Sequence, residues 1–439
     1  MHRSSRRRFI GQAMGGTAAV MAWPSWLQGR ERADSDSAGH LSRPPPLPRP
    51  PQDAVRDETF WERVKEQFPL APGLILMNAA NLCPSPYPVQ ETVFRLTRDV
   101  DADASFQNRS KFGALREESR EALAEYLNAS PDEIAIPRNT SEANNTVLNG
   151  LELGSGDEVV IWDQNHPTNN VSWDVRAQRW GFTVRRVSTP PAPATPDELV
   201  AAFEAAFTAR TRVLAFSHVS NVTGVAMPAE ALCRMARDAG AVTLVDGAQT
   251  FGATRVDLHA MGCDFYTGSA HKWFVGPKEA GVLYVREERI PELWASDVGV
   301  GWAGALEGGA RKFDNLGQRD DAAVSTMATA TRFHQAIGPD LIEERVRALE
   351  THLREAVRRR VPGVRFHTSD EPTRRAGVVV LRVPGADHPE AYRRMYEEHR
   401  IGCALRGGEY EGIRLCPHIY NTIEEVERVA DAIATELGD

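Results

Sequence analysis

The chain has 439 residues, of which 42% are hydrophobic and 25% are charged, so it is long enough for a large buried core divided between two domains. Its formal net charge is −9 and its sequence pI is about 5.8, and no Lys/Arg run with interleaved aromatic residues occurs in the body of the chain. A nucleic-acid partner is therefore not expected.

The first 27 residues have the pattern of an export signal rather than of a folded element. The basic run 6–8 precedes Phe9 and Ile10, and a Gly/Ala-rich stretch continues to about Ala22. That stretch is too short and too rich in small residues to span a bilayer. It resembles a twin-arginine signal, which is an address read by the twin-arginine translocase and not a membrane anchor. We therefore expect a periplasmic or secreted protein without a stable membrane anchor, the simpler alternative being a basic tail.

Residues 28–58 predict an extended linker, because prolines without a period, as in "LSRPPPLPRPPQD", form no core. The globular part is expected to begin near Phe60. The chain has five scattered cysteines without a CxxC pair, so at least one is unpaired. Since twin-arginine substrates fold before export in a reducing compartment, we expect buried thiols rather than a disulfide framework. The cysteines are Cys83, Cys233, Cys263, Cys403 and Cys416.

From about residue 118, short apolar runs alternate with helical patterns. The runs are bounded by Gly, Asp or Asn and read "GDEVVIWD", "TRVLAFSHV", "AVTLVDGA" and "CDFYTGSA". This alternation predicts an α/β domain over 59–318 whose mostly parallel sheet is covered by helices on both faces. After residue 319 come two long helical patterns, the strands "GVVVLRV" and "GIRLCPHI", and a last helix opened by a capping box of Thr422 and Glu425. A smaller α+β domain is expected over 319–439, which the segment after residue 59 can join.

Polar residues follow the predicted strands, and ligands of open α/β sheets bind beyond the carboxyl ends of the strands. Taken singly, each has a simpler explanation: a helix cap for a Thr-Ser pair, a turn for an Asp, a solvated charge for a Lys. Together they supply hydroxyls at a helix N-terminus, a carboxylate, a ring and a lysine. The residues are Thr140, Ser141, His166, Asn221, Asp246, Gln249, Ser269, His271 and Lys272.

These groups match the needs of pyridoxal phosphate. This cofactor requires a lysine that forms an imine, a carboxylate opposite the pyridine nitrogen and a flat group over the ring. It also requires a phosphate site, which helix-terminal N–H groups and hydroxyls provide. Asp246 precedes Lys272 on the neighbouring apolar strand, as this geometry demands. The sequence therefore predicts a pyridoxal-phosphate site, and no metal-ligand set is expected.

Five ordered motifs carry a family resemblance. "NHPTNNVSW", "SNVTG", "VDGAQ", "SAHKWFVGP" and "IRLCPHIYNT" resemble the class V aminotransferase family of fold-type I pyridoxal-phosphate enzymes, in its isopenicillin N epimerase-like branch. The resemblance runs from about Leu76 to the C-terminus. It implies a homodimer of fold-type I subunits, each with a large domain holding the cofactor and a smaller C-terminal domain.

The resemblance also implies roles for single residues. Lys272 would be the Schiff-base lysine, Asp246 would pair with the pyridinium nitrogen, Gln249 would bond the ring hydroxyl and His166 would stack on the ring. The phosphate would be held by Thr140, Ser141, Ser269 and His271, and the substrate carboxylate by Asn221 and Arg414. In the family a neighbouring subunit often adds a Gly-Thr pair to the phosphate site; here the matching stretch "FDNLGQRDD" has Gln318 at the threonine position.

The reaction type is less constrained. Once the substrate is bound to the cofactor, its α-proton is acidic and Lys272 can move it, which permits transamination, epimerisation or loss of a β-substituent as in a C–S or β-lyase. Transferase chemistry on an amino acid or a peptide-like metabolite is the preferred interpretation. A non-catalytic cofactor-binding sensor is the alternative of another class. Cysteine desulfurase chemistry is not expected, because the stretch 405–414, "LRGGEYEGIR", contains no cysteine.

Overall fold

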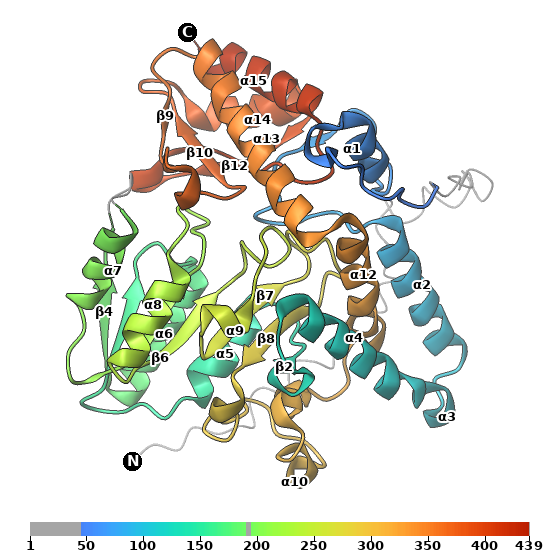
Figure 1. Ribbon diagram of the computed structural model, residues 1–439, viewed down its shortest axis with the longest axis vertical. Helices are drawn as coiled ribbons and strands as arrows, with labels where there is room; N and C mark the ends of the chain where they lie inside the picture. Colours follow the sequence, from blue (N-terminus) through green and yellow to red (C-terminus); the bar gives the residue numbers. More distant parts are fainter. Residues whose placement is uncertain (1–44, 190–194, 439) are drawn as a thin grey trace, which may run out of the picture. The chain divides into compact units, whose positions relative to one another are not determined.

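The computed structural model describes residues 45–189 and 195–438, and from Pro46 onward the chain forms one structural unit (Figure 1). The predicted export signal and most of the predicted linker lie outside the described residues. Within the described ranges, no helix has the length and apolar character needed to cross a bilayer.

The large domain is built on a seven-stranded sheet with the order β2-β8-β7-β6-β5-β3-β4. The strands from β4 to β7 pair in parallel, whereas β8 is antiparallel to both β7 and β2. The mostly parallel sheet predicted from the apolar runs is thus confirmed. The strands are β2 (Ile134–Ala135), β3 (Glu158–Trp162), β4 (Thr183–Val187), β5 (Thr211–Ser217), β6 (Val242–Asp246), β7 (Phe265–Ser269) and β8 (Gly281–Val285).

Helices cover both faces of this sheet because its strands are apolar on both sides. Val159 and Ile161 of β3 belong to one core cluster with α5 (Thr140–Gly150) and α6 (Pro167–Trp180). Val160 of the same strand belongs to the opposite cluster. The helices that contribute to that second cluster include α4 (Lys111–Leu127), α7 (Pro196–Glu204), α8 (Ala229–Asp238) and α9 (Leu258–Met261).

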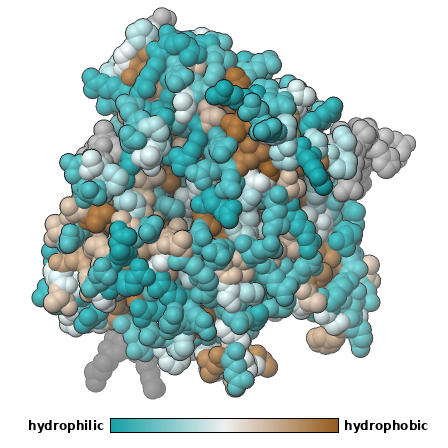
Figure 2. Space-filling view, in the orientation of Figure 1, coloured by the Kyte–Doolittle hydropathy of each residue, from teal (hydrophilic) through white to brown (hydrophobic). Residues whose placement is uncertain are grey.

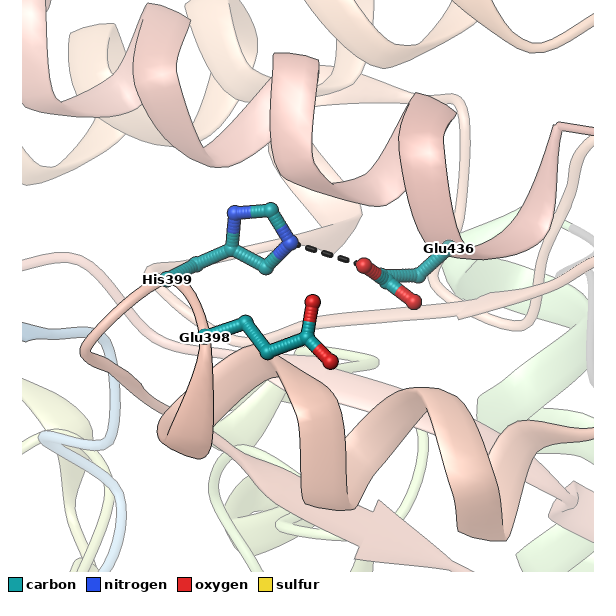
Figure 3. A group of neighbouring side chains, drawn as sticks. All are labelled: Glu398, His399 and Glu436. Atoms are coloured by element: carbon teal, nitrogen blue, oxygen red, sulfur yellow. Dashed lines mark hydrogen bonds and ion pairs between the residues drawn. The ribbon is translucent and has the colours of Figure 1, made fainter.

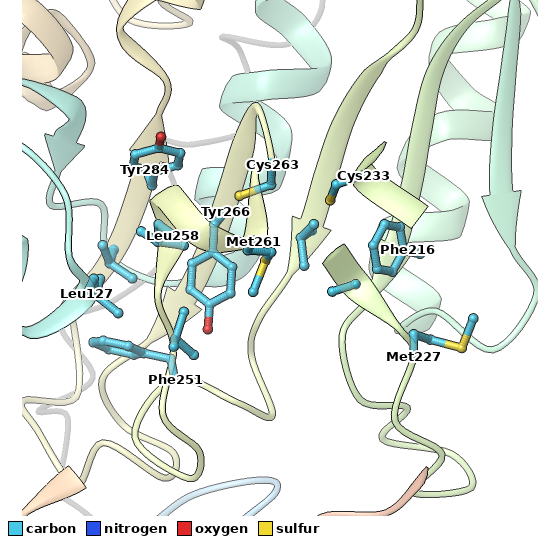
Figure 4. Packing of buried hydrophobic residues seen from close by; sticks show 14 of the residues in the cluster. Leu127, Phe216, Met227, Cys233, Phe251, Leu258, Met261, Cys263, Tyr266 and Tyr284 are labelled. Carbon is cyan, nitrogen blue, oxygen red and sulfur yellow. The ribbon is translucent and has the colours of Figure 1, made fainter. Parts of the chain in front are cut away.

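The thiols lie in apolar surroundings. Figure 4 shows Cys233 and Cys263 among the aromatic and aliphatic side chains of the second cluster. All five cysteines are free and buried, which confirms the expectation of buried thiols.

The small domain contains a four-stranded antiparallel sheet with the order β12-β13-β10-β9. Ile413 and Leu415 of β13 pack in a cluster with three helices, so Arg414 between them faces the other side of the sheet. The capping box of Thr422 and Glu425 opens the last helix as predicted. The elements are β9 (Arg365–Phe366), β10 (Val379–Arg382), β12 (Ala404–Arg406), β13 (Gly412–Leu415), α13 (Pro339–Arg360), α14 (His388–Glu397) and α15 (Ile423–Leu437).

The packed part of the protein begins earlier along the chain than the sequence indicated. A 3-10 turn, η1 (Ala54–Arg56), buries Ala54, whose carbonyl accepts a hydrogen bond from the Trp61 indole at 2.7 Å. Packed structure therefore begins before Phe60, because the indole needs a buried partner. The remaining elements are α1 (Glu58–Lys65), β1 (Ile75–Leu76), which pairs with β11 (Ile401–Gly402), α2 (Tyr87–Ala102), α3 (Phe106–Arg109), α10 (Trp302–Ala305), α11 (Asp321–Ser325) and α12 (Met327–Ile337).

The face of the molecule shown in Figure 2 is largely hydrophilic, but apolar residues gather at the tip that carries α10. The exposed apolar side chains of this segment are Trp294, Val298, Val300 and Leu306.

Candidate active site

A cavity of about 370 Å³ lies beyond the carboxyl ends of the parallel strands. Its lining combines strand-end residues of the large domain with two arginines of the small domain. All predicted site residues except Gln249 line it: Thr140, Ser141, His166, Asn221, Asp246, Ser269, His271, Lys272 and Arg414. The sequence reasoning missed a second group that also lines it: Ala80, Asn81, Asn139, Asn144, Thr168, Asn169, Ala248 and Arg406.

Lys272 and Asp246 come to this cavity from neighbouring parallel strands. Asp246 ends β6 and pairs in register with Thr267 of β7, and Lys272 lies in the turn that follows β7. Burial lowers the pKa of Lys272 to about 8; the attraction of Asp246 opposes this shift and the repulsion of Arg414 adds to it. A lysine amine with this pKa is partly unprotonated near neutral pH, the form that attacks an aldehyde.

The Asp246 carboxylate is held in a fixed orientation. It accepts hydrogen bonds of 3.0 Å from the Asn144 side-chain amide and from the Ala248 backbone N–H. Asn144 is itself oriented by the Thr267 hydroxyl, which donates to its Oδ1 at 2.8 Å. A carboxylate oriented by these two donors has the geometry to pair with a cationic ring nitrogen.

The start of α5 forms another part of the cavity lining. Thr140, the first residue of this helix, donates its N–H to the Ser269 hydroxyl at 2.8 Å, and the two hydroxyls lie 2.7 Å apart. Ser141 follows in the same first turn, where N–H groups have no partner within the helix and the helix dipole favours an anion. Hydroxyls and helix-terminal N–H groups together fit a phosphate.

Two histidines line the cavity in their neutral forms. Burial, and then the charge of Lys272, lowers the pKa of His271 to about 4 and lowers the pKa of His166. His166 Nδ1 accepts a hydrogen bond from the Thr168 N–H at 3.3 Å, which leaves the ring proton on Nε2. His271 Nδ1 is buried and has no hydrogen-bond partner among the described residues, so it is available to a ligand.

The small domain contributes a cationic wall. Arg414, only 4% exposed, donates to the Asn221 carbonyl at 3.1 Å and to the Asn78 side chain at 2.9 Å. Arg406 donates to the same Asn221 carbonyl at 2.6 Å. Asn221 Oδ1 is buried and has no hydrogen-bond partner within the described ranges. This wall suits a carboxylate.

Gln249 and Gln318 do not line the cavity. The Gln249 amide donates to the Ala80 carbonyl at 3.2 Å, and its oxygen accepts from the Trp273 indole at 2.8 Å. The nitrogen and the oxygen of this amide are thus both hydrogen-bonded within the protein. Gln249 contacts the cavity lining through Ala80. Gln318 is exposed and accepts a hydrogen bond of 2.5 Å from Arg109.

A separate group on the small domain has the composition of a metal site. His399 Nε2 lies 2.7 Å from a carboxylate oxygen of Glu436, which accepts its hydrogen bond. Figure 3 shows this contact with Glu398 beside it. Arg394 contacts both carboxylates at 3.0 Å and balances their charge. An arginine in this position fills the role of a cation, so these residues do not suggest a metal centre.

The donor set of the main cavity fits pyridoxal 5′-phosphate at both ends. A buried lysine of lowered pKa lies near a fixed carboxylate, and the phosphate-type donors lie at the start of α5. His271 and Asn221 each present a buried polar atom that has no partner in the described part of the chain, as expected where a ligand completes the site.

Comparison with known proteins agrees with this site. A family model described as "Aminotransferase class-V" matches residues 97–429. The isopenicillin N epimerase of Streptomyces clavuligerus is 32% identical over 395 residues, which cover 86% of this chain and 99% of that protein. A probable cysteine desulfurase of Pyrococcus abyssi is 29% identical over 388 residues, covering 83% of this chain and 95% of that protein.

Among solved structures, a variant of C-DES with glycine covalently linked to its PLP cofactor superposes with a TM-score of 0.76 at 22% identity, covering 84% of this chain and 98% of that one. This likeness shows the fold. With the family match over residues 97–429, it places the chain in the class V aminotransferase family, a family of fold-type I enzymes that use pyridoxal 5′-phosphate.

Proposed function

We propose that this enzyme acts at the α-carbon of an amino-acid-type substrate, with Lys272 bonding the cofactor and carrying the α-proton. The observation that carries the proposal is the buried Lys272 amine of pKa about 8 in one cavity with Asp246. When bound, pyridoxal phosphate withdraws electrons from the substrate and makes its α-proton acidic. A lysine with a pKa close to the working pH is suited both to remove a proton and to return it.

The other lining residues have complementary roles in this proposal. Asp246 receives the ring nitrogen and His166 covers one ring face. The phosphate is held by the residues at the start of α5 and after β7, namely Thr140, Ser141, Ser269 and His271. Asn221 and Arg414 orient the substrate carboxylate, as in the family pattern.

Epimerisation is the reaction we favour over the transamination preferred from sequence alone. It is supported by the likeness to an isopenicillin N epimerase at 32% identity over 395 residues. Inversion requires a proton to leave one face of the α-carbon and return to the other, and Lys272, whose pKa is about 8, is suited to carry the proton on one of these faces.

Exchange of the α-hydrogen in D₂O tests the proposal. The holoenzyme is incubated with L- and D-amino acids, and α-deuterium, configuration and oxo acid are measured. We expect deuterium in both enantiomers, formation of the opposite enantiomer, and no exchange by Lys272→Ala. Stoichiometric oxo acid would instead indicate transamination, and loss of a β-substituent would indicate a lyase. A bound cofactor without exchange of any substrate would indicate the non-catalytic sensor.

We also propose that the protein is exported by the twin-arginine route and works outside the cytoplasm. The support is the basic run 6–8 followed by the Gly/Ala-rich stretch. This route carries folded proteins, so the cofactor can be loaded before export.

A homodimer is part of the proposal. Val298, Val300 and Leu306 are more than half exposed near α10, an exposure typical of a surface that another subunit covers. Gln318 does not line the cavity of its own chain. In the dimer, the Gln318 amide would donate a hydrogen bond to the cofactor phosphate bound in the partner subunit.

A further inference from the structure

Two guanidinium groups share one face of the small sheet. Arg414 of β13 pairs with Ala404 of β12, and Arg406 follows Ala404 by two residues, so both arginine side chains point to the same face. Both line the cavity and both donate to the Asn221 carbonyl, at 3.1 and 2.6 Å. They therefore lie side by side at one end of the site.

Neither arginine has a counter-charge. No carboxylate of the described residues forms an ion pair with Arg406 or Arg414, in a protein that otherwise pairs many of its arginines. The Nε atoms of both are buried and lack a hydrogen-bond partner in the described ranges. Burial, and then the charge of Arg414, lowers the pKa of Arg406 to about 10, which shows how poorly its charge is compensated.

The other charged groups of the cavity do not balance the positive charge of the two arginines. The described lining holds three cationic side chains, Lys272, Arg406 and Arg414, against the single carboxylate of Asp246. Asp246 faces Asn144 and Ala248, and the phosphate-type donors lie at the start of α5. One α-carboxylate neutralises one guanidinium, and a second buried guanidinium without an anion is unfavourable.

We propose that Arg406 binds a second acidic group of the substrate, so that the enzyme selects amino compounds with two carboxylates, such as amino acids or short peptides with an acidic side chain. This inference rests on the proposed function, in which Arg414 takes the α-carboxylate. Arg406 and Arg414 then hold two anionic groups a few bonds apart, and the charge of the substrate-binding end is balanced.

Binding to the holoenzyme tests the inference. Glutamate and 2-aminoadipate are compared with glutamine and norleucine by the change in cofactor absorbance. We expect the diacids to bind about 10- to 100-fold more tightly, the range of one charge-assisted hydrogen-bonded pair. Arg406→Gln should remove this preference by weakening the diacids far more than glutamine, while Arg406→Lys should retain part of it.

A matched control is Arg382→Gln. Arg382 also lies in the small sheet and pairs with Glu411, but it does not line the cavity, so the same loss of charge should leave the preference intact. If Arg406→Gln weakens diacids and glutamine alike, both arginines serve one carboxylate and the inference is wrong, whereas the proposed function stands.

A second measurement does not depend on amine chemistry. Glutarate and valerate are titrated into the holoenzyme by calorimetry. Glutarate should bind more tightly than valerate, and Arg406→Gln should equalise them. Equal binding to the unaltered protein would overturn the two-anion site. If glutarate discriminates but no amino acid changes the cofactor absorbance, the anion site is supported and the proposed function is wrong.

Discussion

The Asn144 side chain donates a hydrogen bond of 3.0 Å to the Asp246 carboxylate, and so the first helix after β2 orients the carboxylate that we propose as the partner of the ring nitrogen. Asn144 is four residues after Thr140, on the same face of α5. In the proposed site, one helix would therefore serve two parts of the cofactor: its N-terminus would hold the phosphate, and its second turn orients the Asp246 carboxylate. The geometry of the site therefore depends on where Thr140 and Asn144 lie along α5.

Replacing Asn144 should weaken cofactor binding. Asn144→Leu removes a donor from Asp246 and leaves the Thr267 hydroxyl without its acceptor. We expect a loss of about 1–3 kcal/mol, or roughly 5- to 150-fold in the dissociation constant of pyridoxal phosphate. The constant is measured by titrating apoprotein and following absorbance. Asn145→Leu is the control, because Asn145 is half-buried, does not line the cavity and donates to the Ser141 carbonyl; an equal effect of both substitutions would contradict the role of Asn144.

Cofactor loading should depend on the protonation of Lys272. With a pKa of about 8, roughly a tenth of the chains hold the free amine at pH 7. The folded pKa lies below that of an ordinary lysine, so the reactive fraction grows as pH rises and is nearly complete above the folded value. The rate of loading of apoprotein, followed by stopped-flow absorbance, should rise about tenfold from pH 6 to 7 and level off above about pH 8.

The control for this profile is Lys278→Met. Lys278 donates to the Cys83 carbonyl at 2.6 Å and to the Ser85 hydroxyl at 2.9 Å, so it is engaged away from the cofactor. Its loss should leave the profile unchanged. Borohydride reduction and peptide mapping should place the pyridoxyl group on Lys272; recovery of the label on Lys278 would refute the assignment.

The parts of the site that follow directly from a strand were predictable from the sequence. Asp246 ends β6 and Lys272 lies in the turn after the neighbouring β7, and an apolar run bounded by polar residues shows where each strand stops. Because the parallel strands end at the same edge of a sheet, sequence order alone brought these side chains together.

The parts that depend on register or on a partner side chain were not predictable. Arg406 reaches the cavity because β12 pairs with β13 with Ala404 opposite Arg414, and a hairpin offset is not visible in residue types. Gln249 is turned away from the cavity because its oxygen accepts from the Trp273 indole, a contact that only the folded chain creates. The burial of Ala54 was likewise not predictable, because the stretch before it is rich in proline and indicates a linker.

Cysteine should not be desulfurated, although a probable cysteine desulfurase is 29% identical to this chain. That reaction needs a mobile thiolate. Here burial raises the pKa of Cys83 and of Cys403 to about 12, and it raises the pKa of Cys416 as well. With cysteine and a reductant, we expect no stoichiometric alanine and sulfide. The prediction is wrong if the unaltered protein forms alanine and sulfide and any of the three Cys→Ala variants no longer does. Sulfide together with pyruvate would indicate lyase activity.

Export should depend on the basic run at the N-terminus. Replacing Arg6, Arg7 and Arg8 with lysine should retain the protein in the cytoplasm with its cofactor bound, because the translocase reads the arginine pair. Fractionation and immunoblotting of the native host measure this. Arg3→Lys lies outside the run and should be exported normally. Unimpaired export of the triple variant would count against the signal.

Two adjacent asparagines should respond in opposite ways to the same substitution. Asn169 is 2% exposed and lines the cavity, yet its amide oxygen and nitrogen have no hydrogen-bond partner among the described residues. Asn170 donates to the Trp162 and Asp163 carbonyls at 3.1 Å and accepts from Asn165 at 3.2 Å.

An unsatisfied buried amide is unfavourable by about 1–3 kcal/mol, so Asn169→Leu should leave the free energy of unfolding of the apoprotein unchanged or raise it. The same change should weaken binding of cofactor or substrate, because the free amide is then no longer available to a ligand. Asn170→Leu breaks three hydrogen bonds and should lower the free energy of unfolding by a similar amount. Denaturant unfolding of apoprotein and cofactor titration measure both effects. If Asn169→Leu destabilises the apoprotein as much as Asn170→Leu does, then Asn169 supports the fold and not a ligand.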